Sequence, residues 1–138
     1  MRMGNEPDTS SGNKELILPE LSYAIIGAAF TVFNHLGWGF SEKDYRNALA
    51  IELQKQTINF RREVYVPLRY GPENVGRYFA DFIIEGKILV ELKVVHKLGY
   101  THAKQVLGYL RSGGFRLGLL IYFTNGGVKY RRILNSGV

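Results

Sequence analysis

The sequence contains no cysteine, and this absence removes several classes of protein at once. Without thiols there is no disulfide scaffold, no thiolate zinc site and no cysteine nucleophile. Long hydrophobic runs are also missing. The longest, Ala24 to Phe33, has ten residues, whereas a membrane-spanning helix needs about 20. The N-terminal stretch lacks the apolar core of a secretory signal. We therefore expect a cytoplasmic protein with no membrane partner.

Acidic residues are scarce in the second half of the chain. None follows Glu91, although the last 47 residues carry eight lysines and arginines. The whole chain has 18 basic and 12 acidic side chains and a formal net charge of +6. This balance favours a polyanionic partner such as nucleic acid. A basic surface that merely maintains solubility is the competing interpretation.

The length of 138 residues corresponds to one domain. Residues 1–18 are polar, rich in turn formers and without periodicity, which predicts a flexible N-terminal tail followed by a folded domain over residues 19–138. Hydrophobic periodicity and turn residues predict the order helix, helix, three strands, helix, two strands. The expected ranges are 20–36, 42–57, 60–70, 78–84, 88–95, 101–111, 116–123 and 128–134.

This order is typical of an α/β or mixed α+β fold, and the third helix permits one right-handed parallel crossover. Gly37 is expected to end the first helix, while Ser41 and Thr101 are expected to cap the second and third. Pro67 suggests an edge strand or a bulge.

Three ionisable residues stand in otherwise apolar strands, where charge is costly: Asp81, Glu91 and Lys93. Glu91 and Lys93 are two apart, so they share a strand face. If the hairpin loop is the three residues 85–87, Asp81 lies opposite Glu91 and the three groups converge. A two-residue loop would instead turn the two carboxylates to opposite faces unless a bulge restored them.

Two neighbouring carboxylates repel each other, and a divalent cation with oxygen ligands relieves that repulsion. Mg²⁺ is the expected ion, with Mn²⁺ as a substitute. Such an ion activates water for phosphodiester hydrolysis, and Lys93 beside it can orient that water or stabilise the developing charge. The competing interpretation is a salt-bridged patch on a solvated sheet face.

The pattern of an acid on one strand and Glu91-x-Lys93 on the next resembles the PD-(D/E)xK nuclease superfamily, which has an αβββαβ, restriction-endonuclease-like core. More closely, residues 20–134 resemble its GxxExxY branch, whose naming motif reads Gly39, Phe40, Ser41, Glu42, Lys43, Asp44, Tyr45. Ala80 replaces the proline of the superfamily's name, and His35, Leu36 and Gly37 match the branch's usual H-x-x-L-G-x-G lead-in only in part.

The resemblance implies a third metal-binding acid, Glu42, which would hold the ion together with Asp81 and Glu91. It also implies that Tyr45 supports Glu42 or touches phosphate, unless Tyr45 is a core aromatic.

Further along, Gln105 and Tyr109 match a Q-x-x-x-Y element of RecB-like nucleases, with His102 one turn earlier on the same helix face. This match implies that Gln105 contacts the site or the scissile strand. Lys104 and Arg111 share a helix face that is expected to line the nucleic-acid approach. A solvated basic face is the alternative for this pair.

Taken together, the sequence predicts a metal-dependent nuclease that acts on nucleic acid, with DNA favoured over RNA as the substrate. A non-catalytic nucleic-acid-binding module with the same fold is the main alternative, and a partner protein with a structural acidic cluster is another. No sequence feature demands a homodimer, although small nucleases of this kind often pair.

Overall fold

The computed structural model describes residues 18–96 and 101–136. The chain forms helices α1 (Pro19–Leu36) and α2 (Glu42–Lys55), strands β1 (Phe60–Tyr70), β2 (Glu73–Ile84) and β3 (Ile88–Val94), helix α3 (Thr101–Gly113), and strands β4 (Leu117–Thr124) and β5 (Gly127–Leu134). The order ααβββαββ is the one the sequence predicts. The expected tail, apart from Leu18, lies outside the described residues, as does the side chain of the expected cap Thr101. Lys97, which the sequence also predicts to line the nucleic-acid approach, lies outside them as well.

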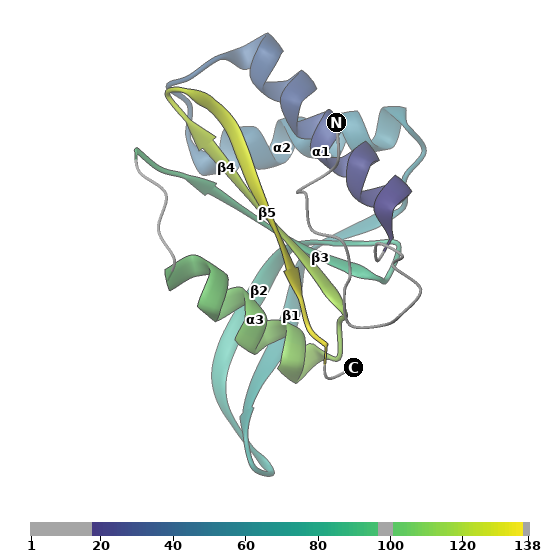
Figure 1. Ribbon diagram of the computed structural model, residues 1–138, viewed down its shortest axis with the longest axis vertical. Helices are drawn as coiled ribbons and strands as arrows, with labels where there is room; N and C mark the ends of the chain where they lie inside the picture. The colour runs from purple at the N-terminus through teal and green to yellow at the C-terminus, as the bar shows by residue number, and fades with distance from the viewer. Residues whose placement is uncertain (1–17, 97–100, 137–138) are drawn as a thin grey trace.

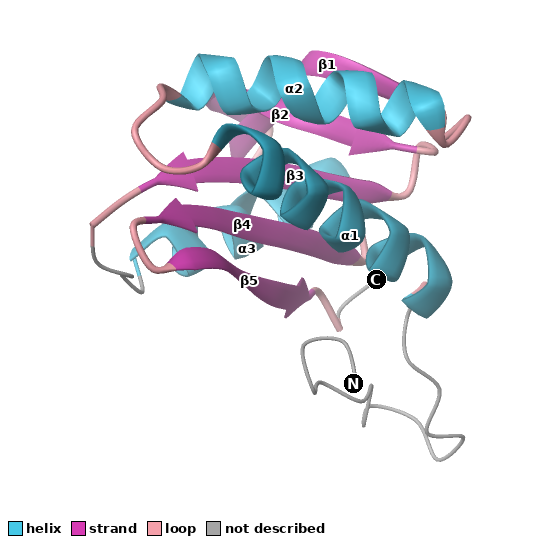
Figure 2. Cartoon of the chain, turned by 90° about the horizontal axis from the view of Figure 1, so that it is seen from above, coloured by secondary structure: helices cyan, strands magenta, loops and turns pink. Residues whose placement is uncertain are grey.

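The five strands form one mixed sheet in the order β1-β2-β3-β4-β5. Only β3 and β4 are parallel, and α3 makes the crossover between them. Helices α1 and α2 cover one face of the sheet and α3 covers the other (Figures 1 and 2). β1 is an edge strand, and its ladder with β2 is irregular next to Leu68, as Pro67 led us to expect.

Local sequence signals explain the two helix boundaries that lie near the candidate site. Gly37 ends α1 with a φ of 75°, a left-handed conformation that glycine adopts without strain. The Ser41 hydroxyl then accepts a hydrogen bond from the Asp44 N–H at 3.1 Å, and the Asp44 carboxylate accepts one from the Ser41 N–H at 3.2 Å. This reciprocal cap places Glu42 in the first turn of α2.

The core has two parts, one on each face of the sheet. Between the sheet and helices α1 and α2 lie side chains such as Phe82, Val90 and Phe123, and between the sheet and α3 lie Leu89 and Leu120. The sheet centre is therefore buried on both faces. This burial accounts for the continuous apolar runs of β3 and β4.

The β1–β2 hairpin is longer than predicted. We expected a turn over residues 71–76, but Tyr70 already pairs with Glu73, so the strands continue almost to the tip. The polar residues near the tip hid this extension because they form a largely exposed part of the strand. In the part of the chain that the structure describes, no helix is long and apolar enough to cross a bilayer.

Candidate active site

The centre of the candidate site is the point where β2 and β3 separate. Their ladder pairs Ile84 with Ile88 and ends at Phe82 and Val90, so the hairpin loop has the three residues 85–87. The next register position brings Asp81 opposite Glu91. The predicted alternative with a two-residue loop is therefore wrong.

Side chains replace the backbone ladder at this position. The Asp81 N–H donates to Glu91 Oε1 at 3.3 Å, and the Leu92 N–H donates to Asp81 Oδ2 at 2.8 Å. Each carboxylate thus accepts a hydrogen bond from the backbone of the opposite strand. The separation of the strands is what gives both acids room beside each other.

The side-chain alternation of β2 breaks at Asp81. Ala80 and Ile83 both pack on the α3 side although they are three residues apart, while Phe82 packs on the opposite side. The neighbouring position on β1 is irregular as well, since Glu63 has a φ of 52°. A non-glycine residue in this left-handed region is uncommon and marks local strain. The distortion coincides with the position that presents the acid.

Glu91 is the most enclosed acid of the group. The residue is 9% exposed, and its Oε1 also accepts a hydrogen bond from the Tyr78 hydroxyl at 2.9 Å. The Tyr78 ring stacks on Tyr109 of α3, with centroids 3.6 Å apart. Lys93 Nζ lies 3.8 Å from Glu91 Oε2. The solvated patch considered from sequence is excluded, because the Asp81 and Glu91 side chains are only 13% and 12% exposed.

The electrostatics of this pair oppose full ionisation. Burial, with the charge of Asp81, raises the pKa of Glu91 to about 7. Burial likewise raises the pKa of Asp81, against the opposing effects of the Leu92 N–H and Arg46. Burial and the Glu91 charge raise the pKa of Tyr78 far above its ordinary value, so its hydroxyl remains a donor. The site favours additional positive charge between the two carboxylates.

Arg46 links α2 to the acids and was not anticipated. Its guanidinium lies 3.4 Å from Glu42 Oε1 and 3.8 Å from Asp81 Oδ1. The other Glu42 oxygen accepts a hydrogen bond from the Val94 N–H at 3.2 Å, at the end of β3. The i, i+4 spacing of Glu42 and Arg46 was the available signal in the sequence. Arg46 supplies a cation beside two of the three predicted metal ligands.

These contacts bear on the predicted metal site. Among residues 18–96 and 101–136, no three acidic or histidine side chains gather closely enough to hold an ion. Asp81 and Glu91 adjoin each other, whereas Arg46 bridges Glu42 and Asp81; besides burial, the charge of Glu42 also contributes to the raised pKa of Asp81. The donor chemistry of the central pair nevertheless fits a hard cation, since both side chains offer carboxylate oxygens in a buried, mutually repelling arrangement.

Tyr45 does not lie where a phosphate contact would require. Its side chain is 0% exposed, its ring stacks on Phe123 at 4.3 Å, and its hydroxyl donates to the Gly37 carbonyl at 2.5 Å. The prediction that Tyr45 touches substrate is therefore wrong, and the core alternative is right. The motif spacing shows that Tyr45 follows Glu42 by almost one turn but not which side faces the core.

The remaining predicted residues lie on α3. His102, Gln105 and Tyr109 follow one face by their spacing, and Tyr109 reaches the site through its stack on Tyr78. His102 lies with its ring 6.1 Å from that of Tyr122, the register partner of Lys93. Gln105 is exposed, as are Lys104 and Arg111.

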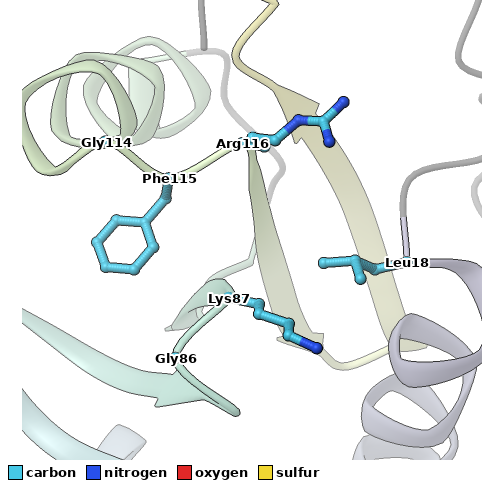
Figure 3. Close-up of a pocket in the computed structure, with 6 residues that line it drawn as sticks. All are labelled: Leu18, Gly86, Lys87, Gly114, Phe115 and Arg116. Atoms are coloured by element: carbon cyan, nitrogen blue, oxygen red, sulfur yellow. The ribbon is translucent and has the colours of Figure 1, made fainter.

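A pocket of about 270 Å³ lies away from these acids (Figure 3). The β2–β3 loop and the connection between α3 and β4 line it, with Lys87, Phe115 and Arg116 among the lining residues. It is therefore at the start of β3, whereas Glu91 lies at the middle of the strand and Lys93 near its other end. None of the described residues that line this pocket is acidic, and the pocket does not include Asp81, Glu91 or Lys93.

Comparison with known proteins decides the family. The sequence matches the PD-(D/E)XK nuclease superfamily over residues 19–133. The chain belongs to this superfamily. Its members generally use divalent metal ions. Membership of the GxxExxY branch stays a prediction. No curated protein matches the sequence.

Solved structures share the fold. The crystal structure of SSO0001 aligns with a TM-score of 0.55 and 18% identity, covering 86% of this chain and 78% of that one. An alkaline exonuclease (LHK-Exo) from Laribacter hongkongensis aligns with a TM-score of 0.51 and 12% identity, covering 86% of this chain and 70% of that one. These similarities concern the fold, and the element order of this chain agrees with the αβββαβ core expected from the sequence.

Proposed function

We propose that this PD-(D/E)XK protein is a Mg²⁺-dependent nuclease that hydrolyses phosphodiester bonds in nucleic acid, with DNA favoured over RNA as its substrate. The observation that carries the proposal is the buried pair Asp81 and Glu91, with Lys93 Nζ 3.8 Å from the Glu91 carboxylate. Two buried acids beside an amine are costly for stability, and this cost is typical of a functional site. The alkaline exonuclease activity named for a structural neighbour agrees with the same reaction class.

Asp81 and Glu91 would hold the metal ion, and Glu42 would join them at the margin of the site. When bound, a divalent ion lowers the pKa of water and neutralises charge on phosphate. Mn²⁺ is the expected substitute. The residues of the chain have separate tasks. Lys93 orients the attacking water, and Tyr78 holds Glu91 through the hydroxyl hydrogen bond.

The α3 residues are the proposed substrate contacts. Gln105 would contact the scissile strand, with His102 and Tyr109 on the same helix face. Lys104 and Arg111 are exposed and would bind backbone phosphates. The excess of 18 basic over 12 acidic residues supports a polyanionic substrate.

A non-catalytic nucleic-acid-binding module is the second candidate. The observation that favours it is the position of Arg46, which pairs with both Glu42 and Asp81 and so supplies positive charge within the chain. In this case the acids would serve the fold and the basic surface would bind nucleic acid without cleavage.

Cleavage assays separate the two candidates. The wild-type chain is incubated with plasmid and with single- and double-stranded oligonucleotides of DNA and RNA, in Mg²⁺, Mn²⁺ or EDTA. We expect cleavage of DNA in Mg²⁺ and Mn²⁺ and none in EDTA. Lys93→Ala should abolish cleavage but retain binding, while Lys43→Ala, an exposed lysine on α2, should behave as wild type. Binding without cleavage in either metal would refute the nuclease and establish the binding module.

A further inference from the structure

The outer face of the β1–β2 hairpin carries two exposed aromatic rings that the proposed chemistry does not use. Tyr65 and Phe79 face each other in the register, with ring centroids 5.6 Å apart and planes inclined by 52°. They remain 43% and 46% exposed. The hairpin extends from the rest of the fold at the lower end of Figure 1. We call Tyr65, Phe79 and the adjacent Arg77 the hairpin platform.

The platform is held in place from within the hairpin. The Asn74 side-chain amide donates a hydrogen bond to the Tyr65 hydroxyl, and the Arg77 guanidinium lies 5.8 Å from the centre of the Phe79 ring. The opposite face of the same strands is covered, since Val66 and Tyr78 pack on the α3 side. The rings therefore point away from α3 on a strand pair that is anchored beneath them.

Exposed aromatic rings bordered by arginine form a surface suited to nucleobases. Bases stack on aromatic side chains, and arginine adds a cation for ring faces and phosphates. A second arginine, Arg62, lies over the Phe82 ring at 5.5 Å further along the hairpin. One exposed acidic residue, Glu63, lies on β1 between Arg62 and Tyr65 of the platform. The charge of the whole chain, +6, complements a polyanion.

The platform adjoins one of the proposed catalytic acids, Asp81, along β2, on the strand face that points away from α3 and Tyr78. Phe79 precedes Asp81 by two residues, so their Cα atoms are about 7 Å apart along the strand. This separation is roughly two base steps of stacked DNA, at about 3.4 Å each. A base in the interior of a duplex is stacked on both faces, so away from duplex ends an unpaired base is the one that can stack on these rings.

We propose that the hairpin platform stacks an unpaired base of the nucleic-acid substrate close to the scissile phosphate, and that the protein prefers single-stranded nucleic acid or duplex with a single-stranded segment. The inference rests on the proposed nuclease function, and it names the substrate class of the same site. A protein partner that buries the rings is the outcome to be distinguished.

Binding to two oligonucleotides tests the contribution of bases directly. One probe is fluorescein-labelled dT15, and the other is a labelled strand of equal length with abasic sugars, which keeps the phosphates and removes the bases. Fluorescence anisotropy is measured in EDTA, so that binding is observed without cleavage. The variants are Phe79→Leu, which removes the ring, and Phe79→Trp, which retains one. The matched control is Phe30→Leu, a ring on α1 that is 40% exposed.

We expect wild type to bind dT15 about tenfold more tightly than the abasic strand, because bases that stack on aromatic side chains add to the affinity. Phe79→Leu should remove most of this difference, and Phe79→Trp and Phe30→Leu should retain it. Thermal melts of each variant confirm that the fold is intact. In Mg²⁺, Phe79→Leu should also lose the preference for single-stranded over blunt duplex substrate.

If Phe79→Leu lost affinity equally for both probes, or showed no change, base stacking on the platform would be refuted. The exposed rings would then be assigned to a protein partner. The nuclease proposal fails separately. A wild type that discriminates the two probes through Phe79 but cleaves nothing would refute the catalytic function while the base-stacking surface stands.

Discussion

The Tyr78 hydroxyl donates a hydrogen bond to Glu91 Oε1 at 2.9 Å while its ring stacks on Tyr109 of α3. This contact joins the crossover helix to the most enclosed acid of the site. It also lowers the pKa of Glu91, against the larger effect of burial. Tyr78 is therefore placed to fix both the orientation and the ionisation of Glu91.

Tyr78→Phe tests this role because it keeps the ring stack and removes the hydrogen bond. The pKa of Glu91 should rise further, so the acidic limb of the pH–activity profile should move to higher pH. Cleavage at neutral pH should fall about tenfold, the equivalent of roughly 1.4 kcal/mol. Tyr70→Phe, at a tyrosine 78% exposed, is the control. An unshifted pH profile would show that Tyr78 only packs.

The raised pKa of Glu91 predicts how stability depends on pH in the absence of metal. Because the folded chain holds a proton that the unfolded chain releases between pH 4.5 and about 7, stability should decrease as the pH rises through this window. Asp81, whose pKa is also raised, contributes with the same sign. Thermal melts in EDTA from pH 4.5 to 8 measure the slope.

Glu91→Gln should flatten that slope, while Glu85→Gln, an exposed acid, should leave it unchanged. Mg²⁺ should stabilise the wild type more at pH 8 than at pH 5, since the ion binds the ionised acids. A metal-free stability that increases across the window would contradict the assignment.

Arg46 and a metal ion should compete for the same acids. Arg46→Gln removes the guanidinium that pairs with Glu42 and Asp81, so less Mn²⁺ should be needed for half-saturation in isothermal titration calorimetry. We expect a severalfold decrease, together with lower stability in EDTA. Lys55→Gln, which removes another ion pair of α2, is the control. Weaker Mn²⁺ binding in Arg46→Gln would contradict this competition and show that Arg46 stabilises the metal-binding arrangement of the acids.

The buried position of Tyr45 predicts a change in stability without a change in chemistry. Tyr45→Phe removes the hydrogen bond to Gly37 and should cost about 1 kcal/mol. Tyr45→Ala opens a cavity in the core and should cost roughly 3–5 kcal/mol. Cleavage per folded molecule should remain at the wild-type level in Tyr45→Phe. A large loss of activity in that variant would restore a substrate role.

The sequence predicts the fold well where the signals are local. The Ser41 cap depends on residues within one turn, and the opposition of Asp81 and Glu91 depends on the length of one loop. Strand spacing then placed Lys93 beside Glu91. Strand periodicity together with the loop length therefore located the central acids relative to each other.

Contacts between distant elements were beyond such reasoning. Tyr78 meets Glu91 only because β2 loses its alternation at Asp81, and no residue pattern signals that break. Arg46 meets Asp81 only after α2 has packed against the sheet. Tyr45 was misplaced for a related reason, since a motif gives spacing but not the side of the helix that packs against Phe123.

The Asp81 and Glu91 carboxylates each accept a hydrogen bond from a main-chain amide of the opposite strand. This arrangement affects the choice of inactive variants. Alanine at either position leaves a main-chain amide without its acceptor, so β2 and β3 are free to pair differently or to fray. Asparagine and glutamine keep an oxygen that can accept the same bond. A substrate-trapping form for crystallography should therefore carry the amide exchange, because truncation would remodel the very cleft that it is meant to capture.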